Sequence, residues 1–133
     1  MGAWRHVGAA ASEADIAALR TVAPPGLPED YYAFLKSHNG LEGEIESRPY
    51  WLQLYPADEV ARIERQGTFQ DFFPGLFVIG GNGGGEAIAF DLRNGAPYPL
   101  VFFDMVNIDL DESIVMLAVS FEALGEMVGL SRA

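Results

Sequence analysis

Apolar residues recur at the three- and four-residue spacing of an amphipathic helix in several parts of the chain. In residues 12–22, Ser12 suits the N-cap and the acidic residues after it suit the positive end of a helix. A further helix is predicted to begin at Pro56, after a strand-like segment. Near the end of the sequence, Ser120 is expected to cap a last helix over Phe121–Val128.

The best-defined helix is predicted over Pro28–His38. Proline suits the first turn of a helix, and acidic residues follow it. Tyr31, Phe34 and Leu35 then form one apolar stripe along the helix. Asn39-Gly40 is a stop signal, because both residues tolerate the left-handed backbone conformation.

Extended segments fill much of the remaining chain. Strands are predicted at Tyr50–Tyr55, Leu76–Gly80, Glu86–Leu92 and Leu100–Met105, whereas Ile114–Val119 is ambiguous between strand and helix. The connections between these segments are short and rich in turn residues, which favours an antiparallel meander over parallel crossovers. The predicted fold class is therefore α+β, with a central antiparallel meander sheet packed with helices.

Length and composition fit one globular domain over residues 1–133. Half of the residues (50%) are hydrophobic and 12% are aromatic, which is ample for a packed core. The absence of cysteine excludes disulfides, zinc–cysteine sites and thiol nucleophiles. Neither a signal peptide nor an apolar run long enough to span a membrane is evident, so a cytoplasmic location is expected.

The charge balance narrows the range of partners. The formal net charge is −11 at pH 7. Proteins that grip nucleic acid need lysine and arginine to neutralise phosphates, and anionic membranes attract basic segments. Neither nucleic acid nor a membrane surface is therefore an expected partner.

A glycine-rich segment, Gly80–Glu86, is the most conspicuous local motif. Glycine loops can cradle phosphates, but a P-loop requires a following lysine and a dinucleotide fold requires a following helix. Here Glu86 follows the glycines, and the next residues are expected to form a strand. A hairpin connection that uses the positive φ angles of glycine is the favoured interpretation, and nucleotide binding is the alternative.

The segment from Asp104 to Glu112 carries acids at alternating positions, as calcium-binding loops do. Counted from Asn107, however, the sixth position of an EF-hand loop holds Glu112 in place of glycine. A solvated acidic edge is the favoured interpretation. No metal or cofactor is expected.

Signals of catalysis are few. His6 and His38 are far apart in sequence, and no nucleophile, base and acid occur at a recognised spacing. Asp91 and Asp104 follow neighbouring predicted strands and could form a carboxylate pair, although aspartate also ends strands for reasons of turn formation. The chain is not expected to be an enzyme.

Three blocks of sequence together resemble the SUKH superfamily, which includes fungal regulators of cell-wall assembly (the Smi/Knr type) and many bacterial immunity proteins. The blocks are Leu27–Gly43, Ile79–Asp91 and Ala118–Leu124, and they occur in the family's order. The matching positions, for which the resemblance implies a structural role, are Leu27, Pro28, Tyr31, Phe34, Leu35, Asn39, Gly40, Gly80, Gly83, Gly84, Gly85, Glu86, Asp91, Ser120 and Phe121.

The resemblance implies a non-enzymatic domain that binds another protein. In bacterial members the partner is typically a toxin, often a nuclease, which the immunity protein neutralises. Because nucleases bind anionic substrates, a strongly acidic inhibitor would be steered onto their basic surface. The candidate contacts are Glu42, Glu44 and Glu46 in the linker after the second helix, Tyr50 and Trp51 as aromatic anchors, and Asp104, Asp109, Asp111 and Glu112 late in the chain.

Each of these candidates has a plainer explanation, since Trp51 would suit the core and the acids would suit solubility. Two other functions stay open beside toxin neutralisation. One is a regulatory or scaffold protein of the same fold that binds a cellular partner. The other is a small-ligand or metal-binding protein that uses the glycine loop.

Overall fold

The computed structural model describes residues 5–6, 10–46, 48–106 and 113–128. The helices are α1 (Glu13–Val22), α2 (Glu29–His38), α3 (Ala57–Gln66), α4 (Thr68–Phe72) and α6 (Phe121–Val128). The strands are β1 (Arg5–His6), β2 (Leu41–Glu44), β3 (Trp51–Leu54), β4 (Leu76–Gly81), β5 (Glu86–Asp91), β6 (Leu100–Asp104) and β7 (Val115–Ala118). These elements confirm the predicted α+β fold.

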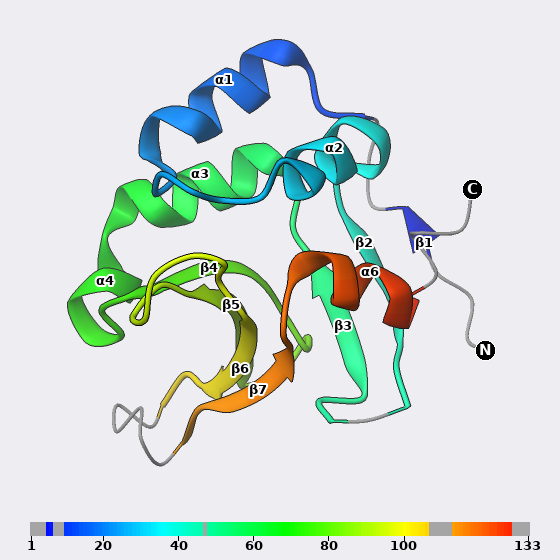
Figure 1. Ribbon diagram of the computed structural model, residues 1–133, viewed down its shortest axis with the longest axis vertical. Helices are drawn as coiled ribbons and strands as arrows, with labels where there is room; N and C mark the ends of the chain where they lie inside the picture. Colours follow the sequence, from blue (N-terminus) through cyan, green and yellow to red (C-terminus); the bar gives the residue numbers. More distant parts are fainter. Residues whose placement is uncertain (1–4, 7–9, 47, 107–112, 129–133) are drawn as a thin grey trace.

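The strands form one sheet in the order β1-β2-β3-β4-β5-β6-β7, and each strand runs antiparallel to its neighbours. The sheet curls, and helices α1, α2 and α3 gather on one side of it (Figure 1). The ambiguous segment after residue 113 forms strand β7, so the meander extends beyond the strands that periodicity predicted.

Strand β2 corrects the sequence interpretation. Residues 41–44 form a strand rather than the expected linker after the second helix, and they pair with β3 in the register Glu42↔Gln53 and Glu44↔Trp51. The short strand β1 extends the sheet beyond β2, through the pair Arg5↔Glu42.

The central strands are buried on both faces. On one face, side chains of β4, β5 and β6 join those of α1, α2, α3 and α6 in a large cluster that includes Phe77, Ile88 and Phe102. On the other face, a second cluster includes Val78 and Phe103. Phe69 of α4 and Ile63 of α3 pack against this cluster. This two-sided burial explains why β4, β5 and β6 are almost continuously apolar rather than alternating.

Polar side chains fix the ends of the helices. The Ser12 hydroxyl accepts a hydrogen bond from the Asp15 amide at 3.1 Å, and the Ser120 hydroxyl accepts one from the Ala123 amide at 3.0 Å. Both N-caps were predicted. Asn39 ends α2. Its side-chain oxygen accepts a hydrogen bond at 2.9 Å from the backbone amide of Ala57, which is the first residue of α3. One asparagine thus ties the end of α2 to the start of α3.

Asp91, at the end of β5, is a buried charged residue with 6% exposure. It accepts hydrogen bonds from the Arg93 side chain at 2.9 and 3.1 Å and from the Arg93 amide at 3.1 Å. Burial acts to raise the pKa of Asp91, but these hydrogen bonds outweigh it and lower the pKa. The carboxylate therefore closes the turn after β5 in its ionised form.

Tyr31 lies at the centre of the larger cluster. Its ring packs edge-on against Phe90 and Phe121, with ring centroids 5.3 Å apart in both pairs. Its hydroxyl is buried and has no hydrogen-bond partner among the described residues. A buried hydroxyl without a partner costs free energy, because it loses its hydrogen bonds to water.

Replacing Asp91 with asparagine should change how stability depends on pH. The native pKa lies below the unfolded value of about 3.9, so the ionised group stabilises the fold fully above that pH. This stabilisation is lost as the pH falls through the native pKa. The difference in free energy of unfolding between wild type and Asp91→Asn, measured by urea denaturation, should shrink below about pH 4. A constant difference from pH 7 to pH 2.5 would contradict the assignment.

Tyr31→Phe should leave stability unchanged or raise it by up to about 1 kcal/mol, because it removes the unpaired hydroxyl and keeps the ring contacts. Tyr31→Ala should instead cost about 3–5 kcal/mol, as expected for a large ring lost from a core. Chemical denaturation of both variants measures the separate contributions of the hydroxyl group and of the ring to the free energy of unfolding. A loss of more than 1 kcal/mol in Tyr31→Phe would show that the hydroxyl has a partner.

Candidate protein-interaction surface

The hairpin of β2 and β3 presents one covered face and one open face. Leu41, Leu52 and Leu54 are buried in the larger cluster. Since side chains alternate along a strand, the residues between them point to the opposite face. This open face, which carries Glu42, Glu44, Trp51 and Gln53, is exposed or half-buried throughout.

Trp51 joins this open face to the glycine loop. A Cβ atom at Gly83 would lie 3.5 Å from Cδ1 of Trp51, so the indole rests against the glycine backbone. Gly83 has a φ of 79°, which favours glycine. The expectation that Trp51 belongs to the core is only half right, because the ring is partly exposed and packs on a loop.

Asn82 organises the glycine loop. Its side-chain oxygen accepts hydrogen bonds from the amides of Gly84 at 2.9 Å and Glu86 at 3.1 Å, and its side-chain nitrogen donates to Glu86 at 3.1 Å. The loop connects the antiparallel strands β4 and β5, as the hairpin interpretation predicted. Because strand β5 follows the loop, the helix N-terminus that holds a phosphate in dinucleotide folds is not present at this position.

The glycines of the motif differ in what requires them. Gly80 lies where β3 and β4 approach closely, and a Cβ there would collide with the carbonyl oxygen of Gln53. At Gly85 no atom lies within 4 Å of the position that a Cβ would occupy, and its φ is not positive. Steric crowding therefore explains Gly80 but not Gly85.

Asp104 lies beside the glycine loop. It is the direct cross-strand partner of Glu86, and the amide of Met105 donates to the carbonyl oxygen of Gly85 at 2.9 Å. Glu86 also forms an ion pair with Arg48 at 3.4 Å, which brings the β2–β3 turn to the same end of the sheet. This end is therefore acidic, with one arginine engaged in an ion pair.

The structure brings several of the predicted contact residues together. Glu42, Glu44 and Trp51 share the open face, Glu46 and Tyr50 are exposed at the turn between β2 and β3, and Asp104 adjoins the glycine loop. Tyr50 has 61% exposure. The candidates Asp109, Asp111 and Glu112 lie outside the described residues.

The suggested carboxylate pair of Asp91 and Asp104 is wrong. Antiparallel neighbours run in opposite directions, so the last residues of β5 and β6 lie at opposite ends of the sheet. Asp104 pairs with Glu86 at the start of β5, whereas the amide of Asp91 bonds to Pro99, just before β6. Asp91 is instead engaged with Arg93.

Strand β7 and the residues close to it in the sequence or the sheet expose apolar side chains that the sequence alone did not single out. Met116 has 57% exposure, Val119 has 67%, and Val106, after β6, has 86%. β7 is the last strand in the sheet order, and it carries no charged side chain. The continuous apolar run of residues 114–119 was the available signal, but it suited a buried strand equally well.

Two features of the described residues bear on other functions. No three histidine, aspartate or glutamate side chains there are grouped so that they could hold a metal ion. No described helix has the length and apolar character that a membrane crossing requires.

Gly80→Ala should destabilise the protein by about 1–3 kcal/mol, because the added methyl group forces β3 and β4 apart. Gly85→Ala is the matched control in the same motif and should change stability by no more than about 0.5 kcal/mol. Urea denaturation of both variants provides the comparison. Equal losses would show that the close approach of the strands does not set the requirement for glycine.

Comparison with known proteins supports the family resemblance. Among curated proteins, no sequence matches the chain. A family model does match, over residues 10–126, a range that contains all three resembling blocks and nearly every described element. This match confirms the predicted resemblance and indicates a domain that interacts with other proteins. The chain therefore belongs to the SMI1 / KNR4 family (SUKH-1).

Proposed function

We propose that this protein is a cytoplasmic immunity protein that neutralises a basic toxin domain, such as a nuclease, by binding to it directly. The observation that carries the proposal is the open face of β2 and β3, where Glu42 and Glu44 lie beside the half-buried Trp51. On this side of the sheet, α4 and a single side chain of α3, Ile63, pack over β4, β5 and β6 at the second apolar cluster.

The arrangement of this face suits a protein interface. Hot spots of binding are commonly aromatic residues that become fully buried in the complex, surrounded by residues that exclude water. Trp51 is already held against Gly83, so little side-chain entropy would be lost when a partner covers it. The flanking glutamates would then form the polar rim of the interface.

Charge adds selectivity to this contact. With a net charge of −11, the protein is attracted to basic surfaces and steers them toward contact. A toxin that acts on nucleic acid needs a basic groove for phosphates. An acidic sheet face that occupies this groove would exclude the substrate without any catalytic step.

The decisive experiment pairs the protein with the toxin domain encoded beside its own gene. Co-expression should restore growth of cells that produce the toxin, and the two purified proteins should bind each other in calorimetry. Trp51→Ala should weaken binding by about 2 kcal/mol or more, as hot-spot residues do. Glu44→Arg should weaken it about tenfold, mainly through a slower association rate that depends on salt.

Asp71→Arg provides the matched control for charge. Asp71 is exposed on α4, at the left of the view in Figure 1, whereas β2 and β3 lie at the right. This variant makes the same change in net charge away from the open face, so it should retain binding within about twofold if local charge matters. Equal weakening by Asp71→Arg and Glu44→Arg would contradict a binding site on the open face.

Two other outcomes would overturn the proposal. If the neighbouring toxin is neither bound nor neutralised, the protein is not its immunity protein. If affinity capture from cells instead yields a host enzyme or scaffold protein that binds through the open face, a regulatory role would replace toxin neutralisation.

A further inference from the structure

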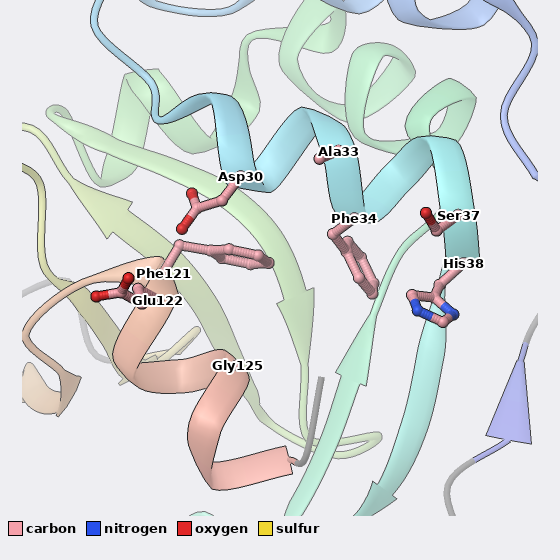
Figure 2. A pocket seen from close by; sticks show the side chains of 8 residues that line it. All are labelled: Asp30, Ala33, Phe34, Ser37, His38, Phe121, Glu122 and Gly125. Carbon is pink, nitrogen blue, oxygen red and sulfur yellow. The ribbon is translucent and has the colours of Figure 1, made fainter. Parts of the chain in front are cut away.

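Helices α2 and α6 enclose a groove on the side of the sheet opposite the open face. Its volume is about 340 Å³. Phe34 and Phe121, with ring centroids 5.7 Å apart, lie in the space between the two helices. Figure 2 shows both rings between the helices, and Gly125 lies on α6, across the groove from α2. A groove of this size is at the small end of ligand sites and suits one side chain rather than a folded element.

One end of this groove is negatively charged. Asp30, in the first turn of α2, and Glu122, in the first turn of α6, line the same end (Figure 2). Burial raises the pKa of Asp30, and the nearby charge of Glu122 adds to this effect. Neither carboxylate forms an ion pair within the described part of the chain. His38 lies at the other end of the groove, next to Phe34.

The adjacent face of α2 shows what this combination of groups can hold. There, Arg20 places its guanidinium group 3.8 Å from the centroid of the Tyr32 ring. The same group donates to the two carboxylate oxygens of Glu29 at 2.9 and 3.2 Å. A carboxylate and an aromatic ring, one helical turn apart on α2, therefore hold an arginine side chain.

The groove offers a similar combination on the neighbouring face of the helix, with a spacing of four residues between Asp30 and Phe34 in place of the three between Glu29 and Tyr32. Asp30 and Phe34 are also one helical turn apart on α2, and α6 adds a second carboxylate and a second ring through Glu122 and Phe121. We propose that the groove between α2 and α6 binds an arginine side chain on the surface of a partner protein. The guanidinium group faces Asp30 and Glu122. The methylene stem contacts only the parts of Phe34 and Phe121 that line the groove, because both residues are otherwise buried, with 5% and 4% exposure.

Arginine fits this groove better than lysine does. Its planar guanidinium group can stack on a ring and donate to two carboxylates at once, whereas an ammonium group is compact and more strongly hydrated. The inference does not depend on the identity of the partner. The groove and the open face lie on opposite sides of the sheet, so the failure of either site would leave the other untouched.

The test uses the full chain and a short blocked peptide, acetyl-Gly-Arg-Gly-amide, titrated by NMR. The amide signals of Ala33 and Gly125 should shift and saturate with a millimolar dissociation constant. The same peptide with citrulline in place of arginine keeps the shape but lacks the charge, and it should bind at least tenfold more weakly. The lysine peptide should also bind more weakly than the arginine peptide.

Variants locate the site. Asp30→Asn and Glu122→Gln keep the shape of each side chain and should each weaken binding of the arginine peptide severalfold. Glu126→Gln changes an exposed acid of α6 that does not line the groove, and it should leave binding unchanged within twofold. The proposal is wrong if the arginine peptide causes no shift, if the citrulline peptide binds equally well, or if Glu126→Gln weakens binding as much as Glu122→Gln does.

Discussion

The two-sided burial of β4, β5 and β6 is the constraint on which the rest of the structure depends. Antiparallel sheets can leave one face in water, but strands that are apolar on both faces need cover on both sides. Helices α1, α2, α3 and α6 supply most of the cover on one face, and α4 with part of α3 supplies it on the other. The outer strands β2 and β3 are apolar on one face only, so the fold does not require cover over their second face.

This division assigns different tasks to different parts of one sheet. The central strands form the core on both of their faces. One face of β2 and β3 is not covered by any helix that the structure describes and is exposed or half-buried. The glycine loop belongs to both regions, because Gly80 allows β3 to approach β4 while Gly83 supports Trp51. A motif that resembles a ligand-binding loop thus has a structural explanation, namely the positioning of an aromatic side chain on an open surface.

The sequence predicted α1, α2, α3 and α6 well because their apolar spacing and end signals act locally. The short helix α4 was not predicted, because its phenylalanines are close to Pro74-Gly75 and indicate a connecting segment instead. Ser12, Pro28 and Ser120 each lie where the predicted helix begins. Strand β2 was missed because it is short and carries glycine and glutamate, which are uncommon in strands. The alternation of Leu41, Gly43 and Ile45 was its only signal. The hydrogen bond from Ala57 to Asn39 could not be predicted, since it joins residues that only the tertiary fold brings together.

The candidate site was predicted in part for the same reason. Glu42, Glu44 and Trp51 were chosen for their chemistry, and the register of β2 against β3 places them on one face. Asp91 and Asp104 each come at the end of a strand in the sequence, which suggests that they are close. Because the two strands are antiparallel, however, their ends lie at opposite ends of the sheet. The groove between α2 and α6 gave no signal, because Asp30 and Glu122 look like ordinary acids at the start of two helices.

The high negative charge also bears on whether two copies of the protein associate through strand β7. An uncharged strand at the edge of a sheet is a ready template for pairing with another molecule, and natural proteins commonly guard such edges with local charges. β7 has no such guard on its own side chains. Two copies that each carry a net charge of −11 repel one another, and salt at physiological concentration screens this repulsion beyond about 8 Å. The net charge therefore disfavours self-association, whereas it would attract a surface of opposite charge.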